Sequence, residues 1–150
     1  MLLLLAGCTG PRDLPGPDAA AHYDQAFEEV TASVGADDLG LTPRSAPLVQ
    51  TEGGDCVYDP GVWEADAESF TADEDSWQPR LDTLNEILAG HGFSEVREFD
   101  YVSGEGFGFS VEDAHGLQLR VLTLEGRTEV RMHGALIDAA DGCSAGVLGV

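Results

Sequence analysis

Seven side chains could carry chemistry through sulfur or imidazole nitrogen, namely three cysteines and four histidines. Structural zinc sites pair such ligands at spacings of about two to four residues, and neither Cys56 nor Cys143 has a neighbour of this kind. The histidines form no such pair either; they are His22, His91, His115 and His133. The spacing therefore predicts no metal site, and we expect no cofactor.

Signatures of common catalytic sites are also missing from the sequence. It contains neither the G-x-S-x-G turn that presents a nucleophilic serine nor the zinc-protease pattern H-E-x-x-H. Residues 104–108 are rich in glycine but do not predict a phosphate loop, because the third glycine is misplaced and the segment joins two expected strands. We expect these glycines to mark a bulge or a close packing contact. We name no catalytic residue and predict that the protein is not an enzyme.

The most ligand-like feature is an interrupted strand at residues 59–61, where Asp, Pro and Gly follow one another. Tyr58 and Trp63 flank this interruption and are candidates for a ligand-facing aromatic platform beside acidic residues. Packing in the core or at a sheet edge is the alternative for both rings, because aromatic side chains bury large apolar areas.

The N-terminal segment is the most informative part of the sequence, with an apolar run that ends in small residues and a cysteine. The tetrapeptide Leu5-Ala6-Gly7-Cys8 resembles the lipobox of bacterial lipoproteins. This resemblance implies that Cys8 receives a diacylglycerol thioether and that cleavage just before it makes it the new N-terminus. Small residues let a peptidase approach the bond, and a thiol is a good nucleophile. Because signal peptides have a basic start and a longer apolar stretch, we expect the true start about 10–20 codons upstream.

Residues 9–17 contain three prolines and two glycines. Such a segment cannot form a helix interior or a central strand. We expect it to be a semi-extended tether between the lipid anchor and the folded domain.

If Cys8 carries lipid, an even number of cysteines remains in an exported protein, and a Cys56–Cys143 disulfide is the simple hypothesis. A bridge of this span would contribute about 4–5 kcal/mol and would hold residues 144–150, which would otherwise fray. The alternative is a cytosolic protein with a chance leucine run, in which both thiols are reduced and buried.

The charge is strongly acidic, with 28 Asp and Glu against seven basic residues, for a net charge of −21. Nucleic-acid binding through phosphates and docking on anionic lipid through a basic patch both need clustered Lys or Arg, so the sequence excludes them. A solvated, solubilising surface is the plain interpretation of the acids. A cation site or a surface for a basic partner is the alternative, although no segment has the ligand spacing of an EF-hand.

Apolar spacing predicts two amphipathic helices, over residues 18–34 and 77–89. Their apolar positions recur at i, i+4, i+7 and i+11, and are Tyr23, Phe27, Val30 and Val34 in the first helix and Trp77, Leu81, Leu84 and Leu88 in the second.

Alternation with a period of two predicts strands. They comprise residues 55–58, a second extended piece over 62–70, and a C-terminal antiparallel meander of four strands. We also predict a short strand at 47–49. Three arginines of the meander, Arg97, Arg120 and Arg131, are expected on the open face of the sheet, paired with acids such as Glu98 or Glu129.

Together these elements predict an α+β fold with two layers, in which an antiparallel sheet of about four to five strands is covered by two helices. The hydrophobic share of 43% suits one core at this length. We expect a signal peptide remnant at residues 1–7, the lipidated cysteine and tether at 8–17, and a single domain at 18–150.

These predictions indicate an exported lipoprotein, anchored in the lipid bilayer through Cys8 and displaying a small acidic, non-catalytic domain on the outer side of the cell membrane. Its layout is similar to that of small lipoproteins of actinobacteria, and an envelope protein is a candidate partner. A soluble acidic inhibitor or immunity-type protein that covers a basic partner is one alternative. A solute- or ion-binding module is another, which a deep apolar pocket would favour.

Overall fold

The computed structural model describes residues 14–139 and 142–148, and shows a mixed α+β fold. Within these residues there are two α-helices, α1 (Gly16–Ser33) and α2 (Leu81–Gly90). Short 3-10 turns are η1 (Asp37–Leu39), η2 (Glu74–Ser76), η3 (Gln78–Arg80) and η4 (Ala145–Leu148). The strands are β1 (Leu14–Pro15), β2 (Thr42–Pro43), β3 (Leu48–Glu52), β4 (Asp55–Asp59), β5 (Gly61–Ala65), β6 (Asp100–Val102), β7 (Gly106–Glu112), β8 (Gln118–Leu124), β9 (Arg127–His133) and β10 (Ala135–Asp138).

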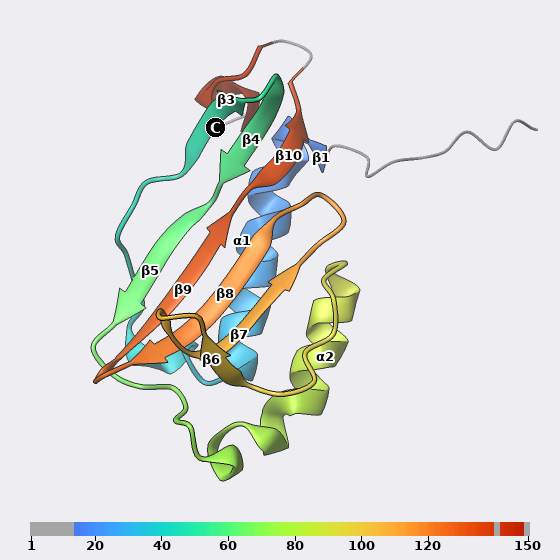
Figure 1. Cartoon of the computed structure of the whole chain (residues 1–150). Helices are drawn as coiled ribbons and strands as arrows, with labels where there is room; N and C mark the ends of the chain where they lie inside the picture. The colour runs from blue at the N-terminus through green and yellow to red at the C-terminus, as the bar shows by residue number, and fades with distance from the viewer. Residues whose placement is uncertain (1–13, 140–141, 149–150) are drawn as a thin grey trace, which may run out of the picture.

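The strands of the described residues form two sheets (Figure 1). The larger has six strands in the order β2-β5-β9-β8-β7-β6, and all of its neighbours are antiparallel. The smaller has four strands in the order β1-β10-β4-β3, of which only β1 and β10 are parallel. The expectation of one sheet with four to five strands is therefore wrong, because β1, β2 and β10 are too short to show an alternating pattern.

The two sheets are joined through one long two-stranded ribbon. Strands β4 and β5 form one side of it, and β10 and β9 form the other. Tyr58 pairs with Ala135 in the smaller sheet and Gly61 pairs with Met132 in the larger. Two residues separate the pairs on each side, so the register continues from one sheet into the other.

The ribbon is interrupted at Pro60, which has no N–H to give to a neighbouring strand. Beside it, the Asp59 carboxylate accepts a hydrogen bond from the Gly134 N–H at 2.7 Å. The side chain thus satisfies a backbone donor at the point where the regular ladder stops. The Asp-Pro-Gly signal seen in the sequence therefore marks the boundary between the two sheets.

In the view of Figure 1, α1 lies behind the six-stranded sheet and α2 lies to the right of β7, and the apolar faces of both helices share one core with the sheet. Of the eight predicted helix positions, seven are buried, and Phe27 is partly buried. In the described part of the chain, no helix has both the length and the apolar character needed to cross a membrane.

Several boundaries differ from the sequence prediction. Residues 14–17, expected in the tether, form β1 and the first turn of α1. The short strand expected at 47–49 extends to Glu52, and the extended piece expected at 62–70 ends at Ala65. The second helix begins at Leu81, because the residues around Pro79 form the 3-10 turn η3 instead. Burial of Trp77 is nevertheless confirmed.

Candidate functional site

The face of the six-stranded sheet that the helices leave open carries most of the described arginines. Along β9, buried residues alternate with the more exposed Arg127, Glu129 and Arg131, which therefore point to this face. Arg120 lies on the same face of β8, directly opposite Arg131. Arg44, at the end of β2, joins them by bonding Glu64 at 2.6 Å. In a chain of net charge −21, this is a local concentration of cations.

Arg120 and Arg131 each have one carboxylate partner. Arg120 contacts Glu105, and Arg131 lies 3.2 Å from Glu129. The predicted open-face position of both arginines and the pairing with Glu129 are thus confirmed. Arg97 instead is exposed and lies in the irregular segment before β6, outside the strands.

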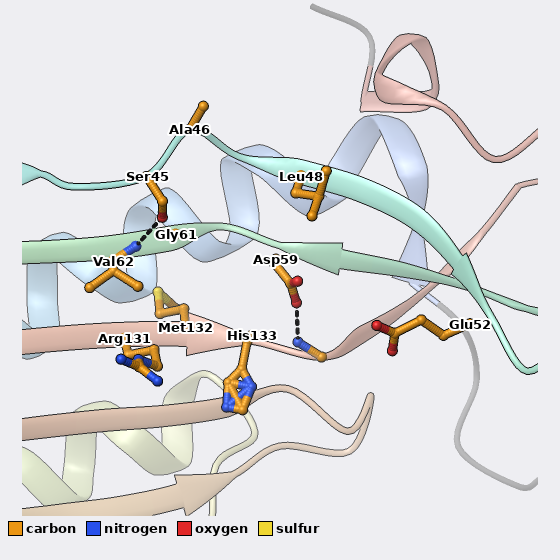
Figure 2. A pocket seen from close by; sticks show the side chains of 11 residues that line it. Ser45, Ala46, Leu48, Glu52, Asp59, Gly61, Val62, Arg131, Met132 and His133 are labelled. Atoms are coloured by element: carbon orange, nitrogen blue, oxygen red, sulfur yellow. Dashed lines mark hydrogen bonds between the residues drawn. The ribbon is translucent and has the colours of Figure 1, made fainter. Parts of the chain in front are cut away.

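A groove adjoins these arginines at the boundary of the two sheets, and we call it the junction groove. It has a volume of about 380 Å³ and is open to solvent. Figure 2 shows Arg131 and His133 side by side along β9, with Val62 above them on β5 and Leu48 farther across on β3. Asp59 also lines the groove but is bonded to Gly134. The groove therefore has a cationic side and an apolar wall.

The two aromatic residues that flank the break are separated from each other by the fold. Tyr58 is 2% exposed, and its ring centre lies 6.2 Å from that of Tyr23 in α1. Burial raises the pKa of Tyr58 to about 12, with the Asp24 carboxylate adding to the shift. Trp63 is partly buried and packs at 4.3 Å on the Phe27 ring. Each ring thus packs against α1, and neither lines the junction groove.

Cys56 and Cys143 form a disulfide, with their Cα atoms 5.5 Å apart. Cys56 lies on β4, and Cys143 precedes the terminal turn η4. The bridge predicted from the cysteine count is therefore present. Cys8, the predicted lipidation site, lies outside the described residues.

Three histidines that no sequence spacing connects meet between α1, α2 and the β7–β8 turn. The ring centre of His22 lies 5.9 Å from that of His91 and 6.4 Å from that of His115. His91 caps the C-terminal end of α2 and also contacts the Glu29 carboxylate. Among residues 14–139 and 142–148, no three Cys, His, Asp or Glu side chains are arranged to hold a metal ion.

A buried carboxylate organises the turn next to these histidines. Asp113 accepts the Tyr23 hydroxyl at 2.7 Å through Oδ2. Its Oδ1 accepts the backbone N–H groups of His115 and Leu117, both at 2.9 Å. Burial and the bond to Asp113 raise the pKa of Tyr23 far above its ordinary value. The carboxylate therefore ties the β7–β8 turn to α1.

We expect Tyr23→Phe to lower the free energy of unfolding by about 1.5–3 kcal/mol, because a buried charged acceptor loses its side-chain donor. Urea unfolding of the variant and the parent measures the difference. Tyr101→Phe is the matched control. Because Tyr101 is 71% exposed, this substitution should change the free energy of unfolding by no more than about 0.5 kcal/mol. Equal effects of the two substitutions would contradict the assigned role of Asp113.

We also expect stability to fall as the pH drops below about 6.5, the value at which an unfolded histidine titrates. In the fold, the pKa of His22 is lowered, mainly by burial and next by the His91 charge. The Asp113 carboxylate opposes this shift, and His115 lowers the pKa of His22 slightly further. The unfolded chain therefore binds the His22 proton first, and acid favours unfolding. Unfolding midpoints at pH 7.5 and 5.5 should differ less in His22→Gln than in the parent or in the control His133→Gln. A pH dependence of the unfolding midpoint in His22→Gln equal to that of the parent would contradict the role of His22 in acid destabilisation.

Comparisons with known proteins give little beyond the fold. No protein-family model matches the chain, and no curated protein matches it. Among solved structures, it is similar to a crystal structure of a DUF4853 family protein from Actinomyces odontolyticus, with a TM-score of 0.58 and 16% sequence identity. The similarity covers 90% of this chain and 75% of that one. At this identity it supports a shared fold and no shared activity.

Proposed function

We propose that this protein is an exported lipoprotein, held in the membrane by a lipid on Cys8 and displaying a small acidic, non-catalytic domain on the outer side. The observation that supports this best is the pairing of cysteines. Two of the three form a disulfide, and the remaining one is the cysteine of Leu5-Ala6-Gly7-Cys8. Structural disulfides persist in oxidising compartments outside the cytosol, where a lipobox would direct the chain.

The start of the domain suits an anchor of this kind. Five residues separate Cys8 from Leu14, where β1 begins beside β10. An extended segment of that length spans about 16 Å at about 3.1 Å per residue. An anchored domain would thus stay close to the bilayer, with the end that carries β1 and the β3–β4 hairpin nearest to it (Figure 1). The open sheet face would then be presented sideways to envelope partners or solutes.

The junction groove favours a second candidate function, that of a solute-binding module. The groove joins cationic Arg131 to apolar Val62 and Leu48. Ligand sites commonly combine a mostly apolar wall with a few polar groups that fix orientation. The two candidates are compatible, because a lipid anchor would hold such a module at the cell surface.

The anchor is tested by Cys8→Ala, expressed in the native host from the gene with its own upstream sequence. We expect the variant to appear in the culture medium or to accumulate as unprocessed precursor, because the thioether needs the Cys8 sulfur. Fractionation and immunoblotting measure its distribution. Thr9→Ala, which keeps the sulfur, should remain with the membrane as the parent does. Membrane retention of Cys8→Ala equal to that of the parent would contradict the proposal.

A further inference from the structure

Two arginines face each other across neighbouring strands on the open sheet face. Arg120 of β8 and Arg131 of β9 are directly opposite in the register, so their side chains leave the same face. Like charges in this position destabilise a sheet. The chain has only seven basic residues against 28 acids, so the pairing is not the result of a generally basic surface.

The carboxylates nearby leave part of each guanidinium without an acceptor. A guanidinium has five N–H donors, and Glu105 and Glu129 each contact one terminal nitrogen of Arg120 and Arg131. The Nε atoms of both arginines are shielded from water and have no hydrogen-bond partner. A ligand cannot reach these buried Nε atoms, but the side chains of Arg120 and Arg131 are 22% and 41% exposed. Their terminal nitrogens can therefore still donate charge-assisted hydrogen bonds to an anionic ligand.

The junction groove supplies the rest of a binding site beside Arg131. Val62 and Leu48 form its apolar wall, and Leu48 is 47% exposed, one of the few large apolar side chains that are. Glu52 and Asp59 also line the groove and carry negative charge away from Arg131 in Figure 2. A second negative charge on the ligand would be repelled there.

We propose that the junction groove binds a small organic monocarboxylate, whose carboxylate lies against Arg131, supported by Arg120, and whose apolar body lies along Val62 and Leu48. This inference deepens the solute-binding candidate and does not depend on the lipid anchor. Because the chain carries a net charge of −21, its surface as a whole repels anions. Saturable shifts at Arg131 would therefore locate a bound anion at this site.

The test is a titration of the full ¹⁵N-labelled chain with hexanoate, followed by NMR through backbone amides and arginine Nε–H groups. We expect saturable shifts at Arg120 and Arg131 and at the backbone of Val62. Hexylammonium, adipate and inorganic phosphate are the comparison probes. Each should bind at least about tenfold more weakly than hexanoate. Hexylammonium lacks the negative head group, adipate adds a second negative charge, and phosphate lacks the apolar body.

The variant Arg131→Gln should weaken hexanoate binding about 10- to 100-fold, since it removes a charge-assisted hydrogen bond. Arg120→Gln is a second variant for the case that Arg131→Gln does not fold. We expect it to weaken hexanoate binding less than Arg131→Gln does. Arg97→Gln removes an exposed arginine outside the groove and should bind as the parent does.

The proposal is overturned by any of three results: no saturable shift at Arg131 with about 20 mM hexanoate, equal binding of adipate, or parental affinity in both Arg131→Gln and Arg120→Gln. Phosphate binding as tight as that of hexanoate overturns the role of the apolar wall. Because the titration is done in solution, its failure leaves the anchor at Cys8 untouched. Failure of the fractionation experiment likewise leaves the groove untouched.

Discussion

Replacing Cys56 and Cys143 together by alanine is expected to lower the free energy of unfolding by about 4–5 kcal/mol. The disulfide closes a loop of 87 residues, so its loss frees a long segment of the unfolded chain. Small domains are stable by only about 5–15 kcal/mol, and the variant should therefore be close to unfolding at 37 °C.

The bridge also holds the C-terminal turn η4 against α1. Leu148 is buried in the core, and a Cβ placed on Gly16 would lie only 2.6 Å from the Val147 carbonyl oxygen. Guanidinium unfolding of the oxidised parent, the reduced parent and the double variant measures the effect. Ser144→Ala, in the same segment, serves as the control. Its free energy of unfolding should stay within about 0.5 kcal/mol of that of the oxidised parent. A double variant within about 1 kcal/mol of the oxidised parent would contradict the role of the bridge.

We expect Gly108→Ala to lower the free energy of unfolding by about 3 kcal/mol or more. A Cβ at Gly108 would lie 1.9 Å from the Val121 carbonyl oxygen of β8. That oxygen belongs to backbone in the centre of the sheet, so it cannot move aside as a flexible side chain could. The β7–β8 pairing would have to open locally, and overpacking that forces backbone shifts is destabilising.

The matched control for this substitution lies on the same strand. Ser110→Ala changes an exposed position of β7 whose hydroxyl accepts only a surface bond from Gln118, and should change stability by about 0.5 kcal/mol or less. Urea unfolding of both variants measures the difference. A Gly108→Ala variant as stable as Ser110→Ala would contradict the close approach of β7 to β8 at Gly108.

The sequence could predict elements whose signal is local. Leu81, Leu84 and Leu88 recur at the period of a helix, and all three are buried on one face of α2. Phe107 and Phe109 alternate with glycines, and both are buried in β7. These patterns are visible because burial repeats along the element itself. The glycine-rich segment predicts a bulge or a close packing contact, and Gly108 makes such a contact with β8.

The division into two sheets could not be predicted, because it depends on pairing between distant segments. Pro60 shows that a strand is interrupted, but not that β5 resumes the same register against Met132. Strand β10 has four residues and only brief alternation. Leu14 belongs to the domain through its pairing with Ile137, at the other end of the sequence.

The candidate site was predictable only in part. The open-face positions of Arg120 and Arg131 follow from alternation, but their direct opposition depends on the β8–β9 register. The groove beside Arg131 is lined by residues of β3, β5 and β9, which no local pattern brings together. The meeting of His22, His91 and His115 likewise needs three elements to be placed in space. The cysteine count predicts the Cys56–Cys143 disulfide only together with the hypothesis that Cys8 is lipidated in an exported protein; without that hypothesis, two reduced thiols were equally compatible with the count.

The most direct test of the proposed anchor is mass spectrometry of the native product, extracted from the membrane of its own host. We expect an N-terminal peptide that begins at Cys8 and carries a diacylglycerol thioether, in a chain whose other two cysteines are linked. An N-terminal peptide that retains the leucines ahead of Ala6, with a free thiol at Cys8, would contradict it.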